Sequence, residues 1–142
     1  MDNSRPNHET AVKFFKYFIE NKIAMILSSI VTAEFCVKQP LTDLPLPNFK
    51  FLPFNIPDSY HLRDLFLAEF KGQIGNQKNP SVKDDYKIAS QCSFNNIKYF
   101  ITEDGDLILK LRDLKSKGKI DFQILSLVEG VEQSFNIPPQ LF

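Results

Sequence analysis

Three carboxylates occupy positions where the surrounding pattern predicts apolar side chains. Glu34 interrupts the apolar run 28–35, and Asp104 follows the strand-like run 97–102. Asp85 falls on one predicted helical face with three apolar residues, Ile88, Ala89 and Cys92. A buried carboxylate is costly unless it is paired, protonated or bound to a metal. The three residues therefore predict one shared acidic pocket.

The chemistry of such a pocket follows from its charge. If Glu34, Asp85 and Asp104 converge, their mutual repulsion opposes ionisation unless a cation is present. Oxygen ligands, with water in the remaining positions, suit Mg²⁺ or Mn²⁺. Such a metal can generate a hydroxide nucleophile and neutralise the charge that develops on a phosphodiester. The three carboxylates are therefore predicted to be catalytic residues of a metal-dependent nuclease.

Each acidic residue also has a purely structural explanation. Asp85 can be a first-turn carboxylate that favours the helix dipole, and Glu34 can be an exposed residue on a helix whose other face is buried. Asp104 and Asp106 are common turn residues, and Asp106 can cap the helix that follows. Asp84 is adequately explained as the fourth residue of a capping box. The sequence pattern leaves these alternatives open.

Helical and strand patterns alternate along the chain, which predicts an α/β fold with a largely parallel sheet covered on both faces. The expected helices span about 8–21, 29–37, 59–70, 82–93 (capped by Ser81), 107–114 and 127–134, and the expected strands about 24–27, 49–54, 97–102 and 122–125. Ser28 or Ser29 can cap the second helix, and residues 71–80 predict a loop. In open α/β sheets ligands bind at the carboxyl ends of strands, where Asp104 and Asp106 are expected.

Composition predicts one globular domain, residues 1–142. A formal net charge of zero argues against a protein that holds nucleic acid by bulk electrostatics, but not against a nuclease that meets its substrate locally. Cys36 and Cys92 lie in apolar segments and predict two reduced core thiols. His8 and His61 lie in no ligand-spaced cluster and predict surface residues. The chain shows no signal core and no apolar run that could span a bilayer, which predicts a cytoplasmic protein without membrane contact.

The three acidic segments, taken in order, resemble the motifs of PIN domains. They are residues 28–35, 85–89 and 101–107, and the resemblance extends from the helix at His8 to the final strand. It implies a PIN-like three-layer α/β/α sandwich with a mostly parallel central sheet. It also implies Mg²⁺- or Mn²⁺-dependent cleavage of single-stranded RNA, often by a dimeric toxin that a cognate antitoxin inhibits. The positions that match the metal-site acids of the family are Glu34, Asp85 and Asp104, with Asp106 as the alternative for the last of them.

One part of the family pattern has no counterpart in this sequence. PIN domains open with a buried central strand that ends in an Asp, the first metal ligand, and no such strand precedes the helix at His8. Asp2 and Asn3 resemble the loop that follows it. We expect either that the full protein carries this strand upstream of Met1 and is an active ribonuclease, or that the chain is a degenerate PIN-like domain. In the second case it has no catalytic activity and acts as a protein-interaction module.

Overall fold

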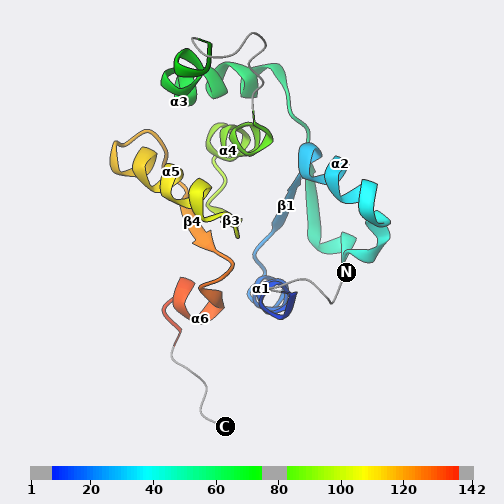
Figure 1. Cartoon of the computed structure of the whole chain (residues 1–142). Helices are drawn as coiled ribbons and strands as arrows, with labels where there is room; N and C mark the ends of the chain where they lie inside the picture. Colours follow the sequence, from blue (N-terminus) through cyan, green and yellow to red (C-terminus); the bar gives the residue numbers. More distant parts are fainter. Residues whose placement is uncertain (1–7, 75–82, 138–142) are drawn as a thin grey trace.

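The computed structural model describes residues 8–74 and 83–137 of the chain, with the backbone alone from 68 to 74. Its elements, in chain order, are α1 (His8–Glu20), β1 (Met25–Ser28), α2 (Ser29–Lys38), the 3-10 helices η1 (Leu41–Asp43) and η2 (Leu46–Asn48), β2 (Phe49–Leu52), α3 (Ile56–Ile74), α4 (Asp84–Phe94), β3 (Tyr99–Thr102), α5 (Gly105–Ser116), β4 (Gln123–Ser126) and α6 (Gly130–Ser134) (Figure 1). The predicted α/β class is confirmed.

The strands form two separate parallel pairs. β1 pairs with β2, from Met25 opposite Phe49 to Ser28 opposite Leu52. β3 pairs with β4 in the same way, beginning with Tyr99 opposite Gln123. Parallel pairing is therefore confirmed, but the described residues form two two-stranded sheets where the sequence predicts one continuous sheet.

The two sheets run in opposite directions. α1 precedes β1 and packs against α6, which follows β4, so the start of β1 and the end of β4 lie at the same end of the molecule (Figure 1). At the other end, the Ser28 hydroxyl at the end of β1 donates a hydrogen bond to Gln91 in α4, shortly before β3 begins. The end of β1 therefore lies beside the start of β3.

Apolar side chains gather in two clusters, one on each side of β3 and β4. The first joins α3, α4, β3 and α5, where Phe66 is fully buried and stacks on Tyr86 with ring centroids 4.2 Å apart. The second joins α1, the first residue of β1 and α6, with Phe14 and Phe18 at its centre. The helix predicted at 8–21 is thus confirmed, and its apolar face is buried as its spacing predicts.

The β1–α2–β2 unit contributes little to either cluster. The Ser28 hydroxyl caps α2 by accepting a hydrogen bond from the Ile30 amide at 3.2 Å, as predicted. However, no side chain of α2 is buried, and Val37 is 86 % exposed. The expectation that the apolar run 28–35 belongs to the core is therefore wrong for its helical part, 29–35, because within the described residues no element covers the outer side of this helix. Within the described residues, no helix is both long and apolar enough to cross a bilayer.

Two element boundaries differ from the sequence prediction. α3 begins at Ile56, and its backbone departs from helical geometry at Phe66 (φ −119°, ψ 16°) before it continues to Ile74. Its last turn therefore occupies the first part of the loop predicted at 71–80, and the rest of that loop lies outside the described residues. The capping box predicted from Ser81 also begins outside them, and the structure has Lys83 as the N-cap of α4.

Candidate functional site

Two of the predicted carboxylates lie within electrostatic reach of each other near the end of β3. α4 leads into β3 through a short turn, and its first-turn residue Tyr86 packs in the same cluster as Leu107 of α5. The first turn of α4 and the start of α5 therefore both pack on this apolar cluster. Asp85 belongs to that turn, and Asp104 is the N-cap of α5, so the two carboxylates are close enough for the charge of Asp104 to act on Asp85.

The environment of Asp85 disfavours its charged form. Burial is the main reason that its pKa is raised above the usual value, and the negative charges of Asp104 and Asp84 raise the pKa further. Lys83 acts in the opposite direction and lowers it. Asp85 is half-buried rather than deeply buried, so the first turn of α4 holds a carboxylate that a proton or a cation would stabilise.

Asp104 is held in place by the start of α5. Its Oδ1 accepts hydrogen bonds from the backbone amides of Asp106 at 3.0 Å and Leu107 at 3.2 Å. Its own amide donates to Thr102 Oγ1 at 3.1 Å. The alternative that Asp106 caps this helix is wrong, because Asp104 is the capping residue and Asp106 is exposed in the first turn. Both bonds use Oδ1.

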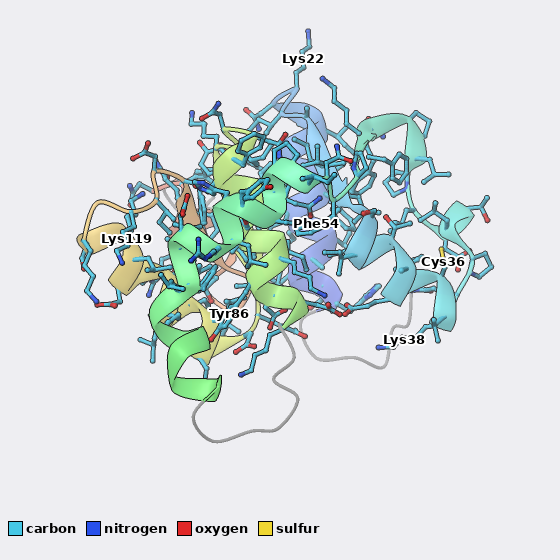
Figure 2. The ribbon with its side chains drawn as sticks, turned by 90° about the horizontal axis from the view of Figure 1, so that it is seen from above. Lys22, Cys36, Lys38, Phe54, Tyr86 and Lys119 are labelled. Atoms are coloured by element: carbon cyan, nitrogen blue, oxygen red, sulfur yellow. The ribbon has the colours of Figure 1, made fainter. Side chains whose placement is uncertain are left out.

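Glu34 lies elsewhere. It is exposed on α2, whose start lies beside Gln91 in the second half of α4 and not beside Asp85 in the first turn. Figure 2 shows α2, marked by Cys36 and Lys38, at the edge of the molecule and away from Tyr86. The cause is the opposite direction of the two sheets, because the ends of β1 and β3 would share an edge only if the strands ran the same way.

The four predicted acids therefore do not form a single group. Within the described residues, no set of three or more His, Cys, Asp or Glu side chains lies in an arrangement that could hold a metal ion. The structure has Asp85 and Asp104 near enough to interact electrostatically, has Asp106 in the first turn of α5, and separates Glu34 from them. Their role as metal ligands stays a prediction.

Sequence reasoning missed a polar network between α3 and α4. Asp58 is 2 % exposed, and its carboxylate accepts hydrogen bonds from the Asn55 amide at 2.7 Å and from Asn95 Nδ2 at 3.1 Å. The Ser90 hydroxyl donates to the carbonyl oxygen of Asp58 at 2.7 Å. Every buried side-chain polar atom in the described residues has a partner, so this network is complete without a ligand and explains how α3 and α4 are held together.

The histidine and cysteine predictions are partly corrected. His61 is half-buried, with Nε2 2.7 Å from the Ser93 hydroxyl, where the sequence predicts a surface residue. Cys92 is a buried thiol as predicted, and burial raises its pKa to about 12. Cys36 is exposed on α2, so the expectation that it is a core thiol is wrong, because no side chain of this helix is buried.

Comparison with known proteins gives no family assignment. No protein-family model matches the chain, and neither a curated protein nor a solved structure shows significant similarity to it. Its function is therefore argued from its own residues.

Proposed function

We propose that the chain is a PIN-type endoribonuclease that cleaves single-stranded RNA with Mg²⁺ or Mn²⁺, in the manner of a toxin with a cognate antitoxin. The observation that carries this proposal is the pair formed by Asp85 and Asp104, which come from two of the three PIN-like segments. The negative charge of Asp104 contributes to the raised pKa of Asp85. A negative charge beside a half-buried carboxylate disfavours its ionised form, and a bound cation would offset that repulsion.

The pair fits the ligand preference of the implied metal. Mg²⁺ keeps several of its waters and is commonly bound by one or two carboxylates together with substrate phosphates, so it does not require a cage of protein ligands. Asp85 and Asp104 supply two carboxylates, one of them fixed by the cap of α5. A cation bound there would supply charge stabilisation to a phosphodiester as it is cleaved.

The residues around the pair have separable roles in this proposal. Asp104 offers Oδ2 from a fixed position, because its other oxygen is held by two backbone amides. Asp85 gains most from a cation, because its charged form is the one that burial and the neighbouring acids disfavour. Lys83 and Lys87 add positive charge to the first turn of α4, although Lys87 already contacts Asp84 at 3.1 Å. An RNA phosphate approaching this turn would meet that charge.

Cleavage of a labelled single-stranded RNA by the purified chain tests the proposal. We expect cleavage that requires Mg²⁺ or Mn²⁺, stops with chelator, and is lost in Asp85→Asn and Asp104→Asn. Asp104→Asn keeps the cap of α5, since Asn is as good an N-cap as Asp, and Asp85→Asn replaces a half-buried carboxylate by an amide of nearly the same size. Asp113→Asn, an exposed acid on α5, is the matched control and should cleave normally.

The outcome for Glu34→Gln decides the extent of the site. Loss of cleavage supports the three-acid site predicted from the sequence, whereas full activity restricts the site to Asp85 and Asp104. Equal cleavage by the wild type, Asp85→Asn and Asp104→Asn would reject the proposed site. Absence of any metal-dependent cleavage, also when an upstream strand is restored, would reject the enzyme in favour of an interaction module.

A further inference from the structure

An apolar cavity of about 670 Å³ lies between the two sheets. Three phenylalanines of α1, Phe14, Phe15 and Phe18, form one wall, and residues 24–27 and 97–99 form two more. Its volume is within the range of roughly 300 to 1,000 Å³ that is usual for ligand pockets. Protein interiors contain few voids larger than a water molecule, so an apolar space of this size indicates an occupant from outside the described residues.

The cavity meets β3 on a face of the strand. Successive side chains of a strand point to opposite faces, and within β3 the alternate residues Tyr99 and Ile101 line the cavity. A polypeptide segment lying against this face would find no backbone partner on it, and its own buried amides and carbonyls would be left unpaired there. A hydrocarbon chain carries no such groups, so it suits this wall better than a further strand does.

The polar side chains that line the cavity are few. They are Asn96, Lys98 and the phenol Tyr99, which lie at or just before the start of β3. The ammonium group of Lys98 lies 5.1 Å from the centre of the Tyr99 ring, so an aromatic face already accommodates its charge. Among the described residues, no acid and no histidine lines the cavity. The body of the occupant is therefore apolar, and a charged group of the occupant has to lie outside this space.

A smaller hollow of about 300 Å³ adjoins the cavity and is basic. The cavity and the hollow share Phe18, Ile23 and Phe49 as walls. Lys22 and Lys50 line the hollow, and no acid lines it in the described part of the chain. Both lysines are exposed, and neither forms an ion pair with another described residue. The hollow therefore provides two positive charges next to an apolar cavity.

The backbone at Lys22 favours a different residue type. Lys22 has a φ of 54°, and it follows the end of α1 at the position that Gly or Asn usually fills. The helices α4, α5 and α6 end in the same way, with Asn96, Gly118 and Asn136 at this position. A lysine here costs conformational energy that glycine or asparagine would avoid. Figure 2 shows Lys22 extending outward from the end of α1. A binding role for its ammonium group accounts for a lysine at this position.

We propose that the cavity and the hollow together bind one single-chain amphiphile with an anionic head group, of the kind represented by a long-chain fatty acid. The hydrocarbon chain occupies the cavity, and the carboxylate lies in the hollow within reach of Lys22 and Lys50. Each methylene group that leaves water for the cavity favours binding, and the head group stays at the solvent side, where water and the lysines surround it. The inference goes beyond the ribonuclease proposal and uses neither Asp85 nor Asp104.

The test is a fluorescence titration of the 142-residue chain with cis-parinaric acid, a long-chain fatty acid that fluoresces more strongly in apolar surroundings. All ligands are kept below their critical micelle concentrations. We expect a saturable rise in fluorescence that corresponds to one site per chain. Myristate should displace the probe about tenfold more effectively than myristyl alcohol, because the two have the same chain length and only the acid gains charge contacts with the lysines.

Protein variants separate the roles of the hollow and the cavity. Lys22→Asn removes a charge and introduces a residue that the backbone favours, so it should weaken the binding of myristate several-fold without loss of stability and leave the alcohol unchanged. Lys50→Gln should have the same effect on the two ligands. Lys119→Gln changes an exposed lysine that lines neither space, and as the matched control it should bind both normally. Ala24→Phe, where the cavity and the hollow meet, should weaken acid and alcohol alike by about tenfold, because the added ring takes the place of the hydrocarbon chain.

Circular dichroism checks the fold of each variant, and the lysine variants keep the proposal testable if Ala24→Phe unfolds. Four results would overturn the proposal. The first is the absence of saturable binding of cis-parinaric acid. The second is an equal affinity for myristate and its alcohol, or an unchanged preference for myristate in both lysine variants. The third is binding to phosphatidylglycerol vesicles without binding of the free acid, which would make a membrane surface the partner. The fourth is a dimer in sedimentation equilibrium that myristate does not dissociate, which would make a second copy of the chain the occupant.

Discussion

Gln91 is the side chain on which the relative placement of the two sheets most depends. It is 1 % exposed in α4, and its Nε2 donates a hydrogen bond to the Leu52 carbonyl at 3.2 Å, at the end of β2. Its Oε1 accepts one from the Ser28 hydroxyl at the end of β1. One amide therefore fixes the carboxyl ends of both strands to α4. Both Gln91→Leu and Gln91→Ala remove this connection. Leu keeps a side-chain volume similar to that of Gln, whereas Ala does not.

The cost of each variant follows from the groups that lose their partners. Gln91→Leu removes one hydrogen bond each from the Leu52 carbonyl and the Ser28 hydroxyl, which destabilises the fold by about 2 kcal/mol. Gln91→Ala also removes buried methylene contacts, and the loss rises to about 3 to 4 kcal/mol. A domain is typically stable by about 5 to 15 kcal/mol, so the alanine variant loses a large share of that margin.

Urea unfolding followed by far-ultraviolet circular dichroism measures both values, with Gln133→Leu in α6 as an exposed control expected to change stability by less than about 0.5 kcal/mol. In Gln91→Leu and Gln91→Ala, hydrogen exchange of the backbone amides should also become faster in residues 25–28 before it does in α4. If Gln91→Leu costs no more than the control, the connection through Gln91 does not hold the first sheet, and the reasoning about sheet direction loses its support.

Three further predictions concern titration, capping and thiol reactivity. The folded-state pKa of Asp85 is raised, so its carboxyl contributes stability at low pH that is lost as the pH rises through that pKa. In chelator at neutral pH, Asp85→Asn should therefore unfold at a higher temperature than the wild type. The difference between the two unfolding temperatures should vanish below the ordinary pKa of 3.8. Asp104→Ala should cost about 1 kcal/mol in urea unfolding while Asp104→Asn costs little, and equal losses would mean that the two amide bonds contribute nothing. A thiol reagent should label Cys36 at once and Cys92 only on unfolding, because burial raises the Cys92 pKa to about 12; rapid labelling of both would contradict the core assignment.

Local signals in the sequence were sufficient to predict the helices and strands, but not to predict how these elements are arranged in space. The helix at His8 and the cap at Ser28 follow from spacing and capping chemistry, which act within a few residues, and the spacing also predicts the helix at 107–114, although its cap is Asp104 and not Asp106. The direction of one sheet relative to the other has no such signal, because it depends on contacts such as that between Ser28 and Gln91, 63 positions apart.

The candidate site, too, could be predicted from the sequence only in part. Asp85 and Asp104 are joined by the short connection from α4 through β3 to α5, and their proximity could be anticipated from the order of the elements. Glu34 could be assigned to the same site only by assuming one continuous sheet. An apolar pattern such as 28–35 shows that a helix has an apolar side, but it cannot show whether another element covers that side.

Paramagnetic broadening by Mn²⁺ tests the central claim that Asp85 and Asp104 form a cation site. Amide resonances of an isotope-labelled chain are recorded as Mn²⁺ is added in small amounts. We predict that broadening begins at residues 84–86 and 104–107, that Mg²⁺ competes with it, and that Asp85→Asn abolishes it. Broadening that begins elsewhere in the chain, or that persists unchanged in Asp85→Asn, would contradict the account.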